Sequence, residues 1–389
     1  MSRRIFILGS TGSIGRSALD VVDHLAATDP ERSIRVVGLA AGKDCRTLAE
    51  QVFKLGVEVA AIADAPNEGS CDPAWYSGPR SAERMIREHA KKGDLVLCAI
   101  VGIAGVESVL AAIDCGCDVA LANKESLVAA GEIVMGAAHR KGVNIIPVDS
   151  EHSAIQQCLP GGCTDQVRQI TLTASGGPLR NASREEIANA TVDQVLDHPT
   201  WNMGPKVTVD SASMMNKALE VIEAHWLFSL PPERIGVVVH PQSVVHGMVE
   251  FEDGSTIAQL APPDMRLPIQ VALSWPHRLG VRWPTVDWAK AQRLDFLPVD
   301  DARFPSVSMG REVIATGGTA GAALNGANEV AVAAFLQGRI PFGAIVDTVK
   351  AAAAEVPPGD GSSLEEVLAT DAEVRRMASA AIETRAHLA

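Results

Sequence analysis

Short apolar runs alternate with amphipathic stretches over the first 149 residues of the chain. The apolar runs have the length and composition of buried strands and cover Arg4–Leu8, Ile34–Leu39, Val57–Ile62, Leu95–Ala99, Val119–Ala122 and Asn144–Val148. The stretches between them have helical spacing and include Ile14–Ala26, Cys45–Leu55, Ala82–His89 and Ser126–Arg140. Because apolar strands separated by helices are typical of a parallel sheet covered on both faces, residues 1–149 are predicted to form a doubly wound, Rossmann-like α/β domain.

The pattern changes after residue 149. Residues 150–275 mix strand-like runs with polar turns, and Asp253-Gly254 has the sequence of a hairpin turn, so an α+β domain is predicted there. The strand-like runs are Gln169–Thr173, Gly236–His240 and Ser243–Phe251. Residues 276–305 carry several prolines and tryptophans with weak periodicity and are predicted to be a linker. Residues 306–389 are dominated by alanine-rich helical patterning and are predicted to form a small helical domain.

The composition of the chain disfavours a nucleic-acid-binding or membrane-spanning protein. The 389 residues are 47% hydrophobic, which is ordinary for a globular protein of two or three domains. The net charge of -13 disfavours binding to nucleic acid or to an anionic membrane. No apolar stretch reaches membrane-spanning length. A phosphorylated ligand would therefore have to be bound by local donors, not by the overall field of the protein.

The seven cysteines form no metal-binding pattern. Cys115 and Cys117 are two apart and do not make a C-x-x-C pair, and Cys158 and Cys163 have no histidine at zinc-finger spacing. An odd count without such spacing is typical of free or buried thiols in a reducing cytoplasm, and that is the expectation here.

A glycine-rich turn follows the first predicted strand and opens a helix. It reads Gly9-Ser10-Thr11-Gly12-Ser13-Ile14-Gly15, which is G-x-x-G-x-x-G where the commoner fingerprint is G-x-G-x-x-G. Glycines there permit a close approach of a pyrophosphate to the free N–H groups of the helix. A strand–helix turn without any ligand is the alternative. Lys43, at the end of the second strand, would suit a 2′-phosphate and therefore favours NADP. Asp44 beside it weakens that argument, and the alternative is that Lys43 is an ordinary surface lysine.

Acidic and basic side chains follow two later strands. Lys124, in Asn123-Lys124-Glu125-Ser126, lies where ligands bind beyond the carboxyl ends of strands, although a surface residue at a helix start would read the same. Asp149 and Glu151 are two apart, so on an extended chain they would face one side. Paired carboxylates favour Mg²⁺ or Mn²⁺ between them. The alternative is a pair of solvated acids at a strand end with a helix cap.

Three further segments carry polar side chains suited to a ligand. In residues 209–220 a helix is predicted to begin near Ser213, so that Asn216, Lys217 and Glu220 share one face; a surface Lys–Glu pair is the alternative. Residues 173–178 read as a phosphate-binding nest or an ordinary loop, and residues 198–205 as a lid or a buried loop that packs Trp201. His240 and His246 are expected to be strand histidines satisfied by hydrogen bonds.

In their order and spacing these segments resemble the signature segments of the 1-deoxy-D-xylulose 5-phosphate reductoisomerase family. The similar segments are Gly9–Gly15, Leu121–Val128, Pro147–Ile155, Thr173–Pro178, His198–Phe228, His240–Phe251, Pro263–Arg266, Leu324–Phe335 and Ile340–Phe342. The resemblance spans nearly the whole chain. It implies an NADPH-dependent and divalent-metal-dependent oxidoreductase of the methylerythritol phosphate route to isoprenoids. Such an enzyme rearranges 1-deoxy-D-xylulose 5-phosphate and reduces the resulting aldehyde to 2-C-methyl-D-erythritol 4-phosphate.

The resemblance also implies a role for individual residues. Metal ligands would be Asp149, Glu151 and Glu220, for Mn²⁺, Mg²⁺ or Co²⁺, with Lys124 counted among the catalytic residues. Residues that contact the substrate would be Lys124, Ser150, Glu151, Ser175, His198, Trp201, Met203, Ser211, Asn216, Lys217 and Glu220. Residues that contact NADPH would be Thr11, Gly12, Ser13, Ile14, Gly42, Lys43, Asp44, Asn123, Glu125 and Gly204. The family further implies a homodimer.

Two departures from the family pattern stand out, and two other functions compete with it. Asp44 stands where the family often has asparagine, which could weaken NADPH binding unless the side chain points away, and Ser213 stands where threonine is usual. One competing function is another NADP dehydrogenase that carries out no rearrangement and would need no metal. The other is a non-catalytic NADP-binding sensor or scaffold, which would leave the three carboxylates without a role.

Overall fold

The computed structural model describes residues 3–29, 34–64, 71–72, 74–159, 161, 164–290 and 293–388, with side chains described up to residue 384. Contacts divide the chain into two compact units. The first unit comprises residues 1–126, 134–153 and 264–284, and the second comprises residues 127–133, 154–263 and 285–389. The domain limits predicted from the sequence stay predictions, and the structure adds that a late segment, 264–284, belongs with the first unit.

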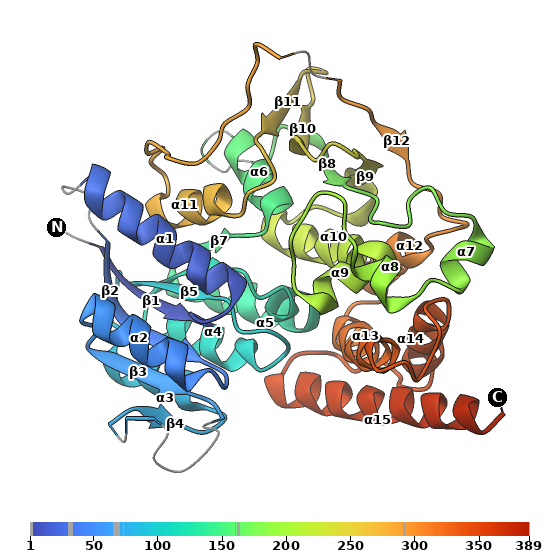
Figure 1. Ribbon diagram of the computed structural model, residues 1–389, viewed down its shortest axis with the longest axis horizontal. Helices are drawn as coiled ribbons and strands as arrows, with labels where there is room; N and C mark the ends of the chain where they lie inside the picture. The colour runs from blue at the N-terminus through green and yellow to red at the C-terminus, as the bar shows by residue number, and fades with distance from the viewer. Residues whose placement is uncertain are drawn as a thin grey trace. The chain divides into compact units, whose positions relative to one another are not determined.

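The first unit is built on a seven-stranded sheet with the order β4-β3-β2-β1-β5-β6-β7, in which every pairing is parallel. Its strands are β1 (Arg3–Leu8), β2 (Ile34–Ala41), β3 (Val59–Ile62), β4 (Tyr76–Ser77), β5 (Leu95–Cys98), β6 (Asp118–Leu121) and β7 (Ile145–Pro147). Its helices, drawn in Figure 1, are α1 (Ser13–Thr28), α2 (Cys45–Leu55), α3 (Ser81–His89), α4 (Gly105–Asp114), α5 (Glu125–Lys141), α6 (Ser150–Cys158) and α11 (Arg266–Ser274). Residues 127–133 of α5 and 154–158 of α6 are assigned to the second unit. The predicted doubly wound sheet is confirmed.

The strand order places the reversal of the sheet beside β1. From β1 the chain adds β2, β3 and β4 on one side and then β5, β6 and β7 on the other. Loops that follow β1 and β5 therefore meet at the topological switch point, where open α/β sheets bind ligands. Alternate residues of β1, Ile5 and Ile7, are fully buried in a core shared with α1, α2 and α11.

The second unit combines a five-stranded sheet, with the order β11-β10-β8-β9-β12, and a set of helices. Its strands are β8 (Val167–Ala174), β9 (Ile235–Val239), β10 (Val245–Phe251), β11 (Thr256–Leu260) and β12 (Leu297–Pro298). Its helices are α7 (Arg184–Ala188), α8 (Val192–Leu196), α9 (Pro205–Ala212), α10 (Met215–Phe228), η3 (Pro232–Arg234), α12 (Ser306–Thr316), α13 (Ala320–Leu336), α14 (Ala344–Ala354) and α15 (Leu364–Leu388). Gly254, with φ of 82°, makes the predicted hairpin turn between β10 and β11.

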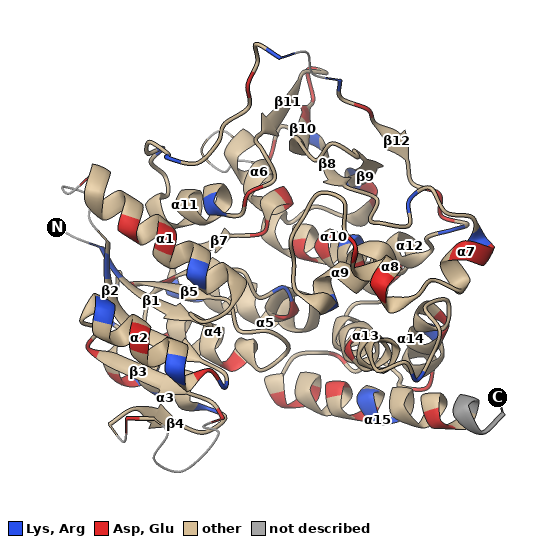
Figure 2. Cartoon of the chain, viewed as in Figure 1, with Lys and Arg blue, Asp and Glu red and all other residues tan. Residues whose placement is uncertain are grey.

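Two cores hold the second unit together. Ile170, Leu172 and Val249 on one face of the sheet pack with Val221 of α10. A larger core joins α9, α10 and the C-terminal helices, and α15 lies along α13 and α14 (Figure 1). Figure 2 shows acidic and basic residues mixed on surface helices such as α1 and α15. Within the described part of the chain, no helix has both the length and the apolar character needed to cross a bilayer.

Candidate active site

The glycine-rich loop that follows β1 lies at the switch point and is closely packed. Gly9 has φ of 87°, and a Cβ there would lie 2.5 Å from the Ala99 carbonyl oxygen. A Cβ on Gly15 would lie 2.3 Å from the Gly9 carbonyl oxygen and 2.4 Å from Ser10 Cα. Gly12 is the N-cap of α1 and makes no side-chain cap, so the first turn of the helix is presented by backbone alone. The loop therefore has the form of a pyrophosphate site.

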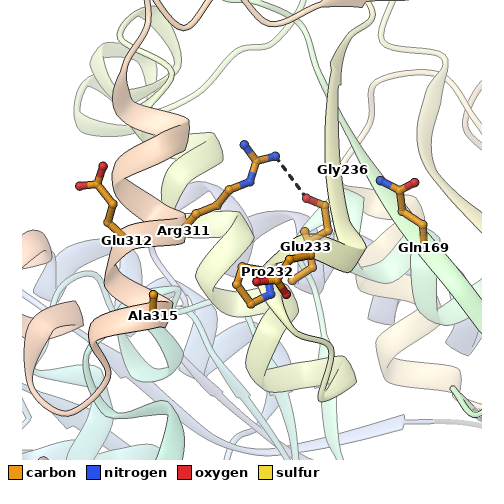
Figure 3. A pocket seen from close by; sticks show the side chains of 8 residues that line it. Gln169, Pro232, Glu233, Gly236, Arg311, Glu312 and Ala315 are labelled. Atoms are coloured by element: carbon orange, nitrogen blue, oxygen red, sulfur yellow. Dashed lines mark hydrogen bonds between the residues drawn. The ribbon is translucent and has the colours of Figure 1, made fainter.

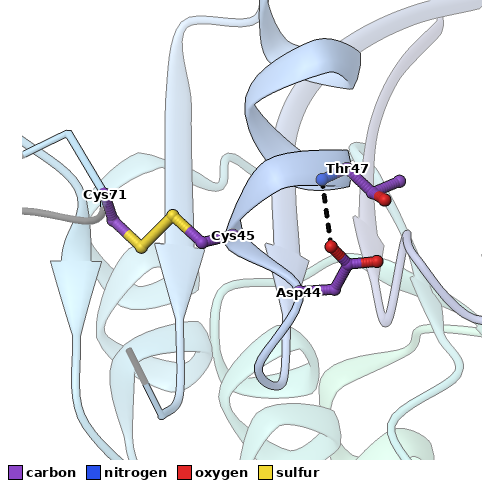
Figure 4. Close-up of a disulfide and its surroundings, with 4 residues drawn as sticks. All are labelled: Asp44, Cys45, Thr47 and Cys71. Atoms are coloured by element: carbon purple, nitrogen blue, oxygen red, sulfur yellow. Dashed lines mark hydrogen bonds between the residues drawn. A yellow bond between two sulfur atoms is a disulfide. The ribbon is translucent and has the colours of Figure 1, made fainter. Parts of the chain in front are cut away.

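Asp44 points to the start of its own helix. It is the N-cap of α2, and its Oδ1 accepts a hydrogen bond of 3.0 Å from the Thr47 amide (Figure 4). That hydrogen bond, with a smaller contribution from Arg16, whose guanidinium lies 3.9 Å away, holds the pKa of Asp44 below its usual range. The Lys43 ammonium makes an exposed ion pair of 3.5 Å with Asp64. The acid that departs from the family pattern is therefore engaged as a helix cap, and Lys43 remains the basic residue of this loop.

Cys45 and Cys71 form a disulfide (Figure 4). The expectation of free thiols is wrong for this pair, because Cys45 follows β2 and Cys71 follows the neighbouring strand β3, which brings their Cα atoms to 5.9 Å despite a separation of 26 residues. Cys98, Cys115 and Cys117 are free, as expected, and burial raises the pKa of Cys98 and Cys117 to about 12. Cys163 lies outside the described residues.

The loop from β6 to α5 carries the next predicted site residues. Asn123 is buried, and its amide donates to the carbonyl oxygens of Ile100 (2.7 Å) and Gly102 (3.0 Å) and to the Glu125 carboxylate (2.7 Å). These bonds join the loop after β6 to the loop after β5. Lys124, next in the chain, forms an ion pair with Asp149, and both side chains are 16% exposed. Lys124 and Asp149 thus meet in the first unit at the carboxyl ends of neighbouring strands β6 and β7.

Asp149 and Glu151 are not placed by an extended chain. Their carboxylate oxygens do lie within 4.8 Å of one another, as predicted. The reason differs from the predicted one, because α6 begins at Ser150 and puts Glu151 in its first turn. The Ser150 hydroxyl donates to the Glu151 carboxylate, and His152 Nδ1 lies 3.7 Å from Asp149 Oδ2. The first unit therefore brings together Lys124, Asp149, Ser150 and Glu151, which supplies two carboxylates and two donors.

Helix α10 presents the third predicted carboxylate. Asn216, Lys217 and Glu220 share one face, as predicted, and the Glu220 carboxylate accepts from the Asn216 amide and pairs with the Lys217 ammonium. Lys217 is 3% and Glu220 1% exposed. The start predicted near Ser213 agrees with the observed start at Met215 to within two residues. The prediction missed a separate helix, α9, which ends at Ala212, and Met214, with φ of 60°, turns the chain into α10. The alternative of a surface Lys–Glu pair is excluded by this burial.

The loop after β8 has the backbone of an anion nest. Gly176 and Gly177 have φ of 80° and 69°, and the Gly177 amide donates to Ser175 Oγ over 3.1 Å. A Cβ on Gly177 would lie 2.6 Å from the Ser211 carbonyl oxygen, so this loop lies directly against the end of α9. The second unit therefore places the loop that carries Ser175 against the end of α9 that carries Ser211, close in sequence to Asn216 and Lys217 of α10.

His198 is a neutral donor beside Ser175. Its Nδ1 accepts from the amides of Trp201 (2.9 Å) and Thr200 (3.2 Å), which assigns the proton to Nε2, 3.0 Å from Ser175 Oγ. Burial, and secondarily Arg180, lowers the pKa of His198 below the ordinary value. The same bonds fix the start of the predicted lid, in which Trp201 packs edge-on against His246 at a centroid distance of 5.9 Å.

His240 and His246 are satisfied strand histidines, as expected. His240 contacts the Asp295 carbonyl oxygen at 2.8 Å, and its Nε2 accepts from the Val244 amide at 3.1 Å. His246 Nε2 contacts the Ala261 carbonyl oxygen at 3.1 Å. Both rings therefore have structural partners.

A pocket of about 410 Å³ lies elsewhere in the second unit (Figure 3). None of the predicted site residues is among those that line it, which are Gln169, Pro232, Glu233, Ile235, Gly236, Arg311, Glu312 and Ala315. Sequence reasoning passed over a different group, Lys206, Asp210 and Asn328, which are joined in the second unit. The spacing of Lys206 and Asp210, four apart on a helix, was the available signal, whereas Asn328 had none.

The switch-point loop, the basic residue after β2 and the carboxylates at the strand ends define an α/β oxidoreductase of the dinucleotide-binding class. Comparison with known proteins identifies the family. Three sequence families match: 1-deoxy-D-xylulose 5-phosphate reductoisomerase over residues 5–131, its C-terminal domain over residues 145–228, and the DXP reductoisomerase C-terminal domain over residues 260–377.

Relatives and solved structures agree over nearly the full length. The 1-deoxy-D-xylulose 5-phosphate reductoisomerases of Symbiobacterium thermophilum and Beutenbergia cavernae are each 48% identical, covering 95% and 98% of this chain and 96% and 98% of their own. The Zymomonas mobilis enzyme in complex with NADPH matches with a TM-score of 0.87 at 40% identity, covering 98% of this chain and 99% of its own. A DOX-P reductoisomerase in complex with NADPH, fosmidomycin and magnesium matches with a TM-score of 0.90 at 36% identity, covering 98% of both chains.

The chain belongs to the 1-deoxy-D-xylulose 5-phosphate reductoisomerase family. The predicted resemblance, fold class, class of enzyme and reaction are thereby confirmed. The predicted cofactors agree with related structures, which hold NADPH and magnesium. The competing functions, a dehydrogenase without rearrangement and a non-catalytic sensor, lose their support.

Proposed function

We propose that Asp149, Glu151 and Glu220 hold the divalent cation with which this enzyme converts 1-deoxy-D-xylulose 5-phosphate to 2-C-methyl-D-erythritol 4-phosphate. Carboxylate oxygens are the donors that Mg²⁺ and Mn²⁺ prefer, and Co²⁺ accepts them as well. The observation that carries the proposal is Glu220, a carboxylate that is 1% exposed and is compensated by Lys217 and Asn216. Burying a carboxylate costs free energy unless opposite charge or hydrogen bonds compensate it. A bound cation would add to the compensation that Lys217 and Asn216 already provide.

When bound, the cation supplies Lewis acidity to the carbonyl and hydroxyl oxygens of the substrate. The surrounding residues orient those oxygens. Lys124, which pairs with Asp149, supplies an ammonium for a substrate oxygen, and Ser150, which donates to Glu151, supplies a hydroxyl at the same end of the sheet. When the substrate binds, the Lys124 ammonium and the Ser150 hydroxyl would donate to substrate oxygens in place of the carboxylates that they now contact.

The substrate phosphate is proposed to bind to Ser175, Ser211, Asn216 and Lys217, with His198 beside them. The Gly176–Gly177 turn supports this assignment because two glycines at positive φ form a tight turn in which no Cβ blocks the approach of an anion to the backbone. His198 is held neutral with its proton on Nε2, so it donates and does not compete as a base. Lys217 supplies the charge that neutral donors lack.

NADPH is proposed to lie along the first unit, where it supplies the hydride. Its pyrophosphate would contact Thr11, Gly12, Ser13 and Ile14, and its 2′-phosphate would contact Gly42, Lys43 and the backbone of Asp44. Asn123 and Glu125, joined by a hydrogen bond to each other and by Asn123 to the loop after β5, would contact the nicotinamide end. Gly204, the N-cap of α9, is assigned to the cofactor on the family resemblance.

Trp201 and Met203 are proposed to cover the ligand as a lid. Both lie in the coil between α8 and α9 and are partly exposed, so they have surface left to bury on closure. Closure would exclude water from the reacting carbons. A homodimer in the cytoplasm remains part of this proposal and rests on the family resemblance.

The test is oxidation of NADPH by the purified protein given 1-deoxy-D-xylulose 5-phosphate and Mn²⁺, followed by chelation and re-addition of metal. Turnover that requires both substrate and metal is expected. Turnover that persists fully after chelation would reject the metal site, and intact NADPH binding without turnover would reject the substrate assignment.

A further inference from the structure

We infer that Asp210 is a positioning residue for the phosphate site, held by Lys206 from its own helix and by Asn328 from α13. These residues are named here the Asp210 clamp. The inference rests on the proposed phosphate site, because it concerns the segment that carries Ser211, Asn216 and Lys217. It adds a role for the C-terminal helices, which supply none of the proposed ligand contacts.

The Asp210 carboxylate is buried, and each of its two oxygens has a side-chain partner. Its side chain is 1% exposed. Oδ2 lies 3.0 Å from Lys206 Nζ, one helical turn earlier on α9, and Oδ1 accepts a bond of 2.8 Å from the amide of Asn328. Asn328 is itself fully buried and lies 118 residues further along the chain. A buried charge with one ammonium and one amide partner fixes the geometry of both, because losing either leaves the charge uncompensated.

The backbone next to Asp210 is fixed from three other directions. The Ser213 hydroxyl donates to the Asp210 carbonyl oxygen over 3.2 Å, and the Ser306 hydroxyl of α12 donates to the Ser213 carbonyl oxygen over 2.9 Å. Gly177 leaves room only for a hydrogen atom against Ser211. The turn from α9 to α10, including Met214 in its left-handed conformation, is therefore held by the Ser213 and Ser306 hydroxyls and by close packing against Gly177.

This arrangement connects the lid to the phosphate site. The lid leads directly into α9, whose first turn carries Lys206 and whose last turn carries Asp210 and Ser211. Helix α13 packs against α9 and supplies Asn328. Since α9 is only eight residues long, a displacement at Asp210 moves Ser211 with it. The clamp would thus hold Ser211, Asn216 and Lys217 in the arrangement that fits a phosphate dianion before the ligand arrives.

The chain offers a closely matched control. Asn325 lies one turn before Asn328 on α13, is also fully buried, and donates 3.1 Å to the Glu329 carboxylate. Asn325→Ala and Asn328→Ala remove the same group from the same helix at the same burial. They differ in the carboxylate that loses its amide partner, which is Glu329 for Asn325→Ala and Asp210 for Asn328→Ala. Only Asn328 reaches α9.

The experiment measures KM for 1-deoxy-D-xylulose 5-phosphate, the Ki of inorganic phosphate as a competitor, KM for NADPH and kcat in both variants. For Asn328→Ala, the KM for the substrate and the Ki of phosphate are expected to rise together by about tenfold, with kcat and KM for NADPH within about twofold of wild type. Asn325→Ala is expected to lower the melting temperature similarly and to leave both constants unchanged. Lys206→Met serves as a second variant if Asn328→Ala does not fold, and the same joint rise is expected.

Equal substrate KM and phosphate Ki in Asn328→Ala and Asn325→Ala would overturn the clamp. Ser211→Ala separates this failure from failure of the phosphate site itself. If Ser211→Ala raises both constants while Asn328→Ala does not, only the clamp is wrong. If Ser211→Ala changes neither, the phosphate assignment is wrong and the clamp falls with it.

Discussion

Changing Gly15 of the cofactor loop to alanine is expected to lower the stability of the protein, whereas changing Gly12 to alanine is expected to weaken NADPH binding. The Gly15 Cβ would lie 2.3 Å from the Gly9 carbonyl oxygen and 2.4 Å from Ser10 Cα, and both contacts are backbone atoms. The Gly12 Cβ would meet only the Gly9 carbonyl oxygen, at 3.4 Å, which is ordinary van der Waals contact. The first substitution therefore strains the protein itself, whereas the second adds a methyl group only to the surface that would face the pyrophosphate.

The magnitudes follow from these contacts. Overpacking typically costs about 1–3 kcal/mol, and Gly15→Ala is expected at the upper end because backbone cannot rotate aside as a side chain can. The gain from alanine in a helix, about 1 kcal/mol, offsets only part of this. Gly12→Ala is expected to cost less, about 0.5–1 kcal/mol, because Gly12 is the N-cap of α1, where glycine is preferred to alanine. Its main effect is expected in binding, where a contact of about 1.4 kcal/mol corresponds to a tenfold weaker Kd for NADPH.

Urea unfolding without ligand and NADPH titration by fluorescence measure the two effects separately. Gly42→Ala is a suitable control for stability, since nothing lies within 4 Å of its added Cβ. Wild-type stability in Gly15→Ala would refute the close approach of the loop to α1. Wild-type NADPH affinity in a stable Gly12→Ala would refute the assignment of this loop to the pyrophosphate.

Three further outcomes are expected. Glu220→Gln keeps the hydrogen-bonding shape but removes a charge from the metal site, so turnover with Mn²⁺ should fall by about a hundredfold or more with the fold retained by circular dichroism; near-normal turnover would reject Glu220 as a ligand. Lys43→Ala should lower the preference for NADPH over NADH by about tenfold in the ratio of kcat/KM values, because the 2′-phosphate loses its cation; an unchanged ratio would reject that contact. Burial lowers the pKa of His198 in the folded protein, so on acidification the unfolded chain protonates at this histidine before the folded one does. The stability that the neutral ring contributes is therefore fully present above the ordinary histidine pKa of about 6.5. It declines as the pH falls from there toward the lowered pKa of the folded state. Urea unfolding at pH 7.5 and 5.5 should therefore show a smaller loss on acidification in His198→Gln than in wild type, and equal losses would contradict the shift.

The glycine loop could be predicted because its geometry is local. Gly9, Gly12 and Gly15 follow a strand and open a helix in a single stretch of chain, and the positive φ of Gly9 and the contact of Gly15 with Gly9 both arise inside that stretch. The parallel sheet was predictable for a related reason: strands buried on both faces leave continuous apolar runs in the sequence. The order of the strands, with β1 beside the reversal, was not predicted, because alternation of strands and helices fits more than one order.

Helix α9 could not be predicted because packing overrides its local preference. Residues Val207, Thr208 and Val209 are β-branched, which disfavours a helix, yet Thr208, Val209, Asp210 and Ala212 are buried by neighbouring elements of the same unit. Met214 then adopts φ of 60°, which a long side chain rarely does. The sequence therefore predicted the start of α10 to within two residues but not the separate helix before it.

The remaining failures share one cause, which is that the decisive contact joins residues far apart in the sequence. Cys45 and Cys71 meet only because β3 pairs with β2, and Asp210 meets Asn328 only because α13 packs on α9. Asp149 and Glu151 were chosen for a correct reason of charge and an incorrect reason of geometry, since α6 and not an extended strand carries Glu151. Residue type therefore identified the chemistry at these positions, whereas the partner that sets the orientation of each side chain required the fold.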